Sequence, residues 1–139
     1  MKNSKYKELF QQAGYELENV NSELSKPKNN EVKYDACVSS RRALYFLVNI
    51  IYQFYGEKNN EELDDHPTLD EMVKYCADYN EKIRFLDFHE VYCRKRDVLD
   101  ENALFCCDEV SKIEACSEVA DKLKGIVIEV VWDGKYPQS

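Results

Sequence analysis

Arg84 and His89 are the two residues of this 139-residue chain whose types and spacing could support catalysis. An unperturbed histidine has a pKa near 6.5, so His89 could transfer a proton at neutral pH. On a helix, five positions turn two side chains about 140° apart, so the pair would share a site only loosely. The alternative interpretation is a surface arginine beside a half-buried histidine that packs against Phe85 and Phe88.

The compact basic cluster Arg94, Lys95 and Arg96 is a second candidate site. It could contact an RNA backbone or a protein partner, with Tyr92 available for stacking on a base. Acidic residues follow directly, so the cluster could equally be a solvated face that pairs with itself. The net charge of −8 opposes unguided binding to phosphate backbones, which disfavours RNA as a partner.

The sequence offers little for metal or redox chemistry. Its six cysteines include no CxxC pair, although ligands two to four residues apart are typical of metal sites. The acidic segment 57–67 lacks the alternating ligands and the glycine of a calcium loop. We therefore predict no metal and no cofactor, and we interpret most cysteines as small buried side chains. The first residues lack the apolar core of a signal peptide, so we expect reduced thiols and a cytoplasmic location.

These residues must be positioned by helices. The most apolar stretch of the chain predicts a helix at the centre of the fold. It runs from about 31 to 55, and Gly56 is expected to end it as the C′ residue. Residues 43–55 are almost entirely apolar, so this helix belongs at the centre of a bundle. These thirteen residues are too few to cross a bilayer, which needs about 20.

One polar stripe interrupts the central helix. Arg42, Asn49 and Gln53 share a face at helical spacing, and we expect a buried contact between this stripe and the fourth helix. Arg41 and Arg42 need partners on a mostly buried helix, so we predict a pairing with an acidic residue of the first or last helix. Contact with phosphate or with a partner is the functional alternative for these two arginines.

The other helices follow from apolar periodicity and capping signals. Thr68 and Glu71 match a capping box, which predicts a short helix up to a break at 78–81. The first helix is expected over 4–24, the fourth over 82–93, and the last from 107 or 108 to 131. The charged run 94–102 either continues the fourth helix or forms a loop. The sequence thus predicts one all-α domain of about five helices over 1–139, with its core over 5–131 and a tail over 132–139 whose Trp132 could fold back.

The stretch DACVSSRRALYFLVNIIYQFYG, residues 35–56, is distinctive enough to suggest a family. It resembles the second helix of HEPN-superfamily domains, and most closely the branch found free-standing and in front of the helicase motor of type I restriction subunits. Arg42, Ala43 and Leu44 match that branch, whereas Tyr45 replaces its usual Glu. HPTLDEMVKYC and the long final helix correspond to the next features of the family, so the resemblance covers about residues 5–131.

The resemblance also says what an active site would need. Active HEPN ribonucleases carry an Arg followed by a His after four to six residues; the His acts as general acid and base, and the Arg stabilises the charged phosphorane. Arg84 and His89 satisfy Arg-x4-His, but they come early, and Phe85 stands where a polar residue is common. The Gly-Asn and Ala-Ala-His of the similar branch do not occur between 87 and 102.

We therefore predict a non-catalytic HEPN-like interaction module, acting as a homodimer in a bacterial or phage defence, restriction or toxin–antitoxin context. A nucleotidyltransferase, a helicase or a restriction subunit is the kind of partner that the resemblance implies, and no membrane is expected. Two alternatives stay open. One is a metal-independent endoribonuclease toxin that uses Arg84 and His89, with Arg96 as a further candidate. The other is a small acidic inhibitor that mimics nucleic acid.

Overall fold

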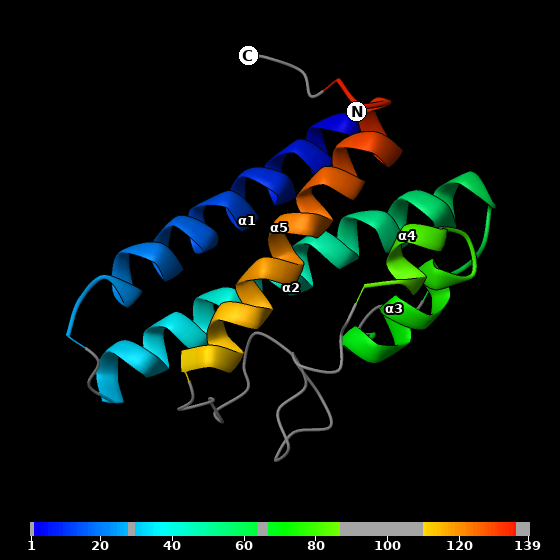
Figure 1. Ribbon diagram of the computed structural model, residues 1–139. Helices are drawn as coiled ribbons and strands as arrows, with labels where there is room; N and C mark the ends of the chain where they lie inside the picture. Colours follow the sequence, from blue (N-terminus) through cyan, green and yellow to red (C-terminus); the bar gives the residue numbers. More distant parts are fainter. Residues whose placement is uncertain (1, 28–29, 64–66, 87–109, 136–139) are drawn as a thin grey trace.

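The computed structural model describes residues 2–27, 30–63, 67–86 and 110–135. All regular structure in these segments is helical, so the predicted all-α bundle of about five helices is confirmed (Figure 1). In chain order the helices are α1 (Lys2–Leu24), α2 (Asn30–Lys58), α3 (Leu69–Ala77), α4 (Glu81–Arg84) and α5 (Val110–Trp132). None of the helices in these segments has an apolar stretch long enough to cross a bilayer.

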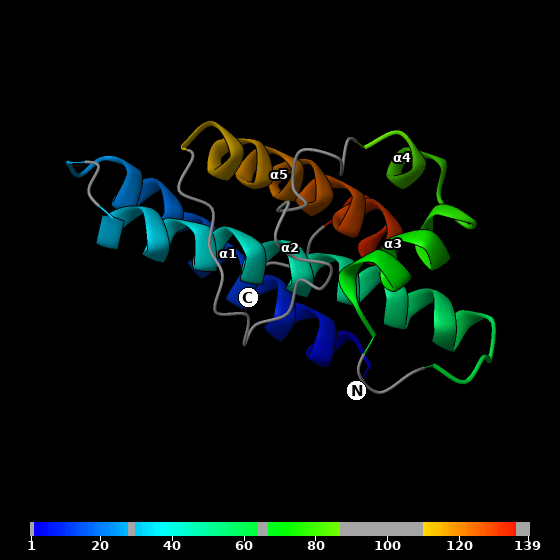
Figure 2. The same cartoon turned by 90° about the horizontal axis from the view of Figure 1, so that it is seen from below.

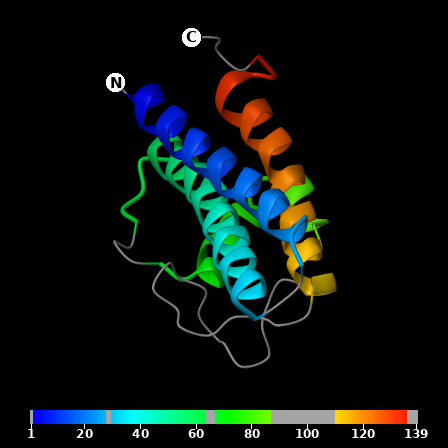
Figure 3. The same cartoon turned by 90° about the vertical axis from the view of Figure 1, so that its left-hand side faces the viewer.

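Helix α2 lies at the centre of the bundle, as its apolar sequence predicts. It packs against α1, α5 and α3, whereas α4 contacts α3 and α5 (Figures 1 and 3). Its side chains are buried on several sides because three other helices cover it. The buried core residues from its second half are Ala43, Leu44, Leu47, Val48, Ile50, Ile51 and Tyr52.

Helix α1 runs antiparallel to both α2 and α5, so the start of α1 lies near the end of α5 (Figures 1 and 3). Phe10 and Trp132 meet there edge to face, with ring centroids 5.6 Å apart. At the opposite end, Val20 of α1 and Ile113 of α5 share a small core cluster with Cys37 of α2. Trp132 is therefore the last residue of α5 and packs on the core, whereas the sequence placed it in a tail.

Gly56 does not end α2, which is a correction to the sequence prediction. The helix continues to Lys58, and Asn60 takes the left-handed conformation with φ 54°. The amide of Glu61 donates to the Gly56 carbonyl and that of Asn60 to the Glu57 carbonyl, which together make a Schellman motif. Gly56 is needed for packing instead, because a Cβ there would lie 2.7 Å from Leu63 Cγ.

Two short helices follow α2: α3 packs against α2, and α4 packs against α3 and α5 (Figure 2). The Thr68–Glu71 capping box is present in full at the start of α3, as predicted. Asn80 caps α4, which has only four residues; the rest of the predicted fourth helix, from 87 onward, lies outside the described residues. An ion pair of 2.6 Å between Lys82 and Glu129 joins α4 to α5.

Candidate functional site

Arg84 is exposed at the end of α4, and its guanidinium is bound to the protein itself. Its Nη2 donates to the carbonyl of Ala77, the last residue of α3, over 2.9 Å. An arginine in this position satisfies a carbonyl at a helix C-terminus, where positive charge is favourable. Phe85 is 77 % exposed beside it. His89 lies outside the described residues, so its pairing with Arg84 stays a prediction, as does the role of Arg94, Lys95 and Arg96.

The polar stripe of α2 contacts α1 at one end and lines a groove further along. Arg42 Nη1 is 3.9 Å from Glu16 Oε2, which confirms the expected acidic partner on the first helix. Further along α2, Gln53 Nε2 donates to Asn49 Oδ1 over 3.1 Å. The three side chains are half-buried, and Asn49 and Gln53 line an open groove. The structure describes the predicted fourth helix only up to residue 86, so the expected buried contact with that helix stays a prediction.

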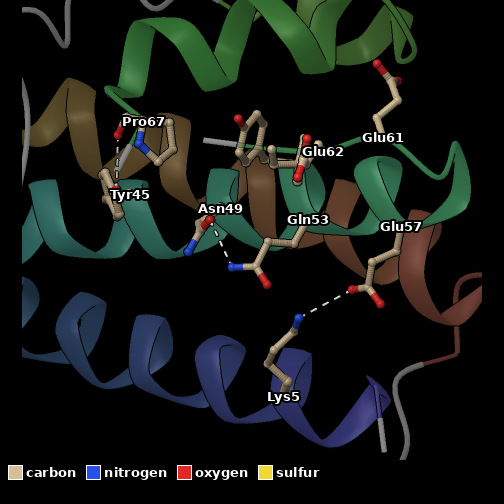
Figure 4. A pocket seen from close by; sticks show the side chains of 10 residues that line it. Lys5, Tyr45, Asn49, Gln53, Glu57, Glu61, Glu62 and Pro67 are labelled. Carbon is tan, nitrogen blue, oxygen red and sulfur yellow. Dashed lines mark hydrogen bonds and ion pairs between the residues drawn. The ribbon is translucent and has the colours of Figure 1, made fainter. Parts of the chain in front are cut away.

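This groove has a volume of about 450 Å³ and runs along α2 (Figure 4). We call it the amide groove, after Asn49 and Gln53 on its floor. Lys5 of α1 forms one side, and the chain that leads from α2 to α3 forms the other through Glu62 and Pro67. The remaining residues that line it are Tyr45, Tyr52, Glu57, Glu61 and Leu63.

Glu57 lies at the end of the floor and is held by α1. Lys5 Nζ is 3.3 Å from Glu57 Oε1, and the Tyr6 hydroxyl donates a hydrogen bond to the same oxygen. Burial raises the pKa of Tyr6, and the hydrogen bond to the Glu57 carboxylate raises it further. Tyr6 therefore stays a neutral donor that fixes Glu57 in place.

Glu61 is fixed by two tyrosines at the other side of the groove. The Tyr75 hydroxyl donates to Glu61 Oε1 over 2.7 Å and the Tyr79 hydroxyl over 3.0 Å. These two hydrogen bonds, that of Tyr75 first, lower the pKa of Glu61. Desolvation and the bond to Glu61 raise the pKa of Tyr75 to about 12. Because Tyr79 also stacks on Tyr55 of α2, the loop that carries Glu61 is tied to the core.

The floor of the amide groove offers an amide nitrogen as donor and an amide oxygen as acceptor. The Gln53–Asn49 bond uses one donor and one acceptor of the two side-chain amides. Asn49 Nδ2 and Gln53 Oε1 make no hydrogen bond to the described part of the chain, and Figure 4 shows both side chains at the groove. Within that same part, Glu62 makes no ion pair. The site can therefore bind an amide and a cation together.

A metal site is not built from these carboxylates. No three His, Cys, Asp or Glu side chains within the described segments are arranged to hold a metal ion. Asp64, Asp65 and His66 lie outside those segments. The thiols of Cys37, Cys76 and Cys116 are buried, as expected of small apolar side chains. Burial raises the pKa of the Cys76 thiol to about 12, so this thiol is unreactive.

A second groove of about 420 Å³ lies between the end of α1 and the start of α5. We call it the acidic groove, because three carboxylates of α5 line it and none of its described lining residues is a Lys or an Arg. Its lining includes Asn21, Leu24, Ser25, Glu114, Glu118 and Asp121.

Sequence reasoning missed Lys5 and Glu57 as groove residues. A signal for Glu57 was present, since Tyr45, Asn49, Gln53 and Glu57 recur every four residues along one helix face. Ending the helix at Gly56 assigned Glu57 to a loop and cut the stripe short. Lys5 comes from another helix, so no spacing along the chain could have indicated it.

The chain matches no family model, no curated protein and no solved structure. The relation to HEPN domains therefore stays a prediction that rests on helix α2 and on the order of the predicted helices.

Proposed function

We propose that this chain is a non-catalytic interaction module. The observation that carries the proposal is the amide groove, in which two hydrogen-bonding amides and the Glu57 carboxylate lie on the central helix of a packed core. Sites with placed polar groups on rigid elements suit recognition, because their geometry changes little on binding. The defence, restriction or toxin–antitoxin setting, the homodimer and the nucleotidyltransferase, helicase or restriction partner are parts of this proposal that rest on the HEPN resemblance.

Arg84 supports the non-catalytic role. A catalytic arginine would have to direct its guanidinium at a phosphate, whereas that of Arg84 is bound to the Ala77 carbonyl. We expect Arg84→Ala to lower the free energy of unfolding by about 0.5–1 kcal/mol, because one exposed hydrogen bond is lost. Arg84→Lys should retain part of that stability, since the ammonium can still approach the C-terminal end of α3.

The test compares assembly with RNA cleavage in the full-length chain. Sedimentation velocity should show either self-association or, after a partner is identified and purified, a stoichiometric complex on remixing. A mixed RNA pool incubated with the parent, Arg84→Ala and His89→Ala proteins should stay intact in all three. A strictly monomeric chain with no reconstituted complex would contradict the proposal. Cleavage that both substitutions abolish without unfolding would replace it with the ribonuclease alternative.

A further inference from the structure

We infer that the amide groove binds an extended, arginine-containing segment of a protein partner. This inference rests on the proposed function and specifies the chemistry of the partner. Three properties of the groove point to it: a donor and acceptor pair on the floor, an excess of carboxylates around it, and a tyrosine ring on its wall.

The floor is complementary to a peptide bond. Asn49 Nδ2 offers a donor and Gln53 Oε1 an acceptor, one helical turn apart on the same face of α2. The backbone of an extended chain presents carbonyl oxygens and amide hydrogens, which complement a donor and an acceptor respectively. Every buried peptide unit needs a hydrogen-bond partner for both groups. Side-chain amides that recognise backbone in this way favour an extended segment over a compact cation, which has donors for Gln53 Oε1 but no acceptor for Asn49 Nδ2.

The charges around the floor favour a basic side chain in that segment. The groove has one ammonium, that of Lys5, and three carboxylates, those of Glu57, Glu61 and Glu62. Lys5 is already paired with Glu57. Glu61 accepts two tyrosine hydroxyls, and Glu62 is exposed at the edge of the groove, so both carboxylates face an incoming cation.

Arginine fits this environment better than lysine. Its planar guanidinium binds carboxylates through two donors and stacks on aromatic rings, whereas an ammonium acts as a point charge. Tyr45 supplies a ring on the wall, and its hydroxyl donates to the Pro67 carbonyl over 3.2 Å. The ring is therefore held beside the floor and cannot swing away without breaking that bond.

The probe is a fluorescently labelled, blocked peptide of glycine and arginine, Gly-Arg-Gly-Arg-Gly, titrated with the full-length protein and followed by anisotropy. Its neutral counterpart carries citrulline, which has nearly the shape of arginine without the charge. Spermidine, added as a competitor, tests whether a cation without peptide bonds is sufficient. We expect the arginine peptide to bind at least five-fold more tightly than the citrulline peptide, and spermidine to displace it only weakly.

Each substitution in the amide groove has a matched control in the acidic groove. Glu62→Gln and Glu118→Gln both remove one exposed carboxylate, and Asn49→Leu and Asn21→Leu both remove one side-chain amide. Lys5 and Asn21 lie about 24 Å apart along α1, well beyond the screening length of about 8 Å in physiological salt.

We expect the arginine peptide to lose about three-fold in affinity in Glu62→Gln and about five-fold in Asn49→Leu. It should lose less than two-fold in either control. Since Glu62 is exposed, its substitution should leave the fold intact even if Asn49→Leu does not.

Several results would overturn the inference. Equal losses in Glu62→Gln and Glu118→Gln would mean that only the net charge matters. The groove would be a general cation site if spermidine displaced the labelled peptide as effectively as the unlabelled peptide does, and if Asn49→Leu left the affinity for the peptide unchanged. Absence of binding at millimolar protein would also refute it. If a partner still assembles with the chain and Glu62→Gln leaves that complex unchanged, the amide groove is not the binding site, but the proposed function as an interaction module still holds.

Discussion

The amide groove and the acidic groove have nearly the same volume, about 450 Å³ and 420 Å³, and each has three carboxylates. They differ in the helices that support the carboxylates and in how deeply those helices are buried. The floor of the amide groove is α2, which is covered by the core on its other sides, and two bonded side-chain amides lie on it. The acidic groove is made from the exposed faces at the end of α1 and the start of α5.

This difference teaches that charge and recognition are separate properties of the surface. Carboxylates on any exposed helix attract cations, but solvent and salt screen them, so they orient little. Groups fixed to buried elements can select one orientation of a ligand, because little entropy is lost when the ligand binds. Glu57 and Glu61 are fixed by tyrosines of other helices, which the described residues of the acidic groove do not show.

The largest effect should come from the core that supports each groove. Ile50 is fully buried behind the floor of the amide groove, so Ile50→Ala should lower the free energy of unfolding by about 2–5 kcal/mol. Leu24 is only half-buried at the acidic groove, and Leu24→Ala should cost about 1 kcal/mol. Urea unfolding followed by circular dichroism measures both. Equal costs would mean that the two grooves rest on equally packed supports.

The next effect concerns the attachment of Glu57. Tyr6→Phe removes the hydroxyl that donates to Glu57 while keeping the ring, so we expect a loss of about 1–2 kcal/mol in urea unfolding. Tyr15→Phe on the same helix is the control, since Tyr15 is 77 % exposed and should change stability by less than about 0.5 kcal/mol. A Tyr6→Phe protein as stable as the control would show that Glu57 is not fixed by α1.

The tyrosines around Glu61 should make stability depend on pH. The pKa of Glu61 is lowered in the folded chain. The ionised Glu61 therefore contributes to the stability of the fold at neutral pH, above the ordinary glutamate pKa of 4.5. It is lost as the pH falls from that value through the lowered pKa, because the protonated carboxyl no longer accepts both hydroxyls as strongly.

The double substitution Tyr75→Phe and Tyr79→Phe should remove this dependence. Carbon-detected NMR titration of Glu61 should show its pKa rising toward the ordinary value in the double variant. The stability difference between parent and variant should be larger at pH 7 than at pH 3. A difference that does not change with pH would mean that the tyrosine hydroxyls do not stabilise the ionised Glu61.

Lys5 should have the smallest effect on stability and a definite effect on binding. Its ion pair with Glu57 is exposed, so Lys5→Met should change the free energy of unfolding by less than about 1 kcal/mol. Loss of the competing ammonium should tighten binding of the arginine peptide about two- to three-fold. Lys26→Met, which removes the partner of Glu23 at the far end of α1, is the control of equal charge and should leave affinity unchanged. The same gain in affinity for both variants would mean that only the net charge of the protein determines peptide binding.

The features that the sequence predicted correctly are local ones. The Thr68–Glu71 capping box needs only residues three positions apart, and the central position of α2 follows from its own composition. The buried stripe of α5, with Ile113, Cys116 and Leu123, follows from helical periodicity.

The features that it missed depend on distant partners. Gly56 has the composition of a helix end, but the position of Leu63 makes it a packing residue. The groove requires Lys5 to lie beside Glu57, 52 residues further along the chain. Contacts of this kind are set by how the helices pack, which the spacing of residues along one helix does not encode.

NMR of the side-chain amides tests the central claim most directly, because both grooves contain an asparagine. In a ¹⁵N-labelled full-length protein titrated with the arginine peptide, the amide signals of Asn49 and Gln53 should move saturably, while that of Asn21 stays in place. Movement of the Asn21 signal to the same extent, or no movement of the Asn49 and Gln53 signals at millimolar peptide, would contradict the account.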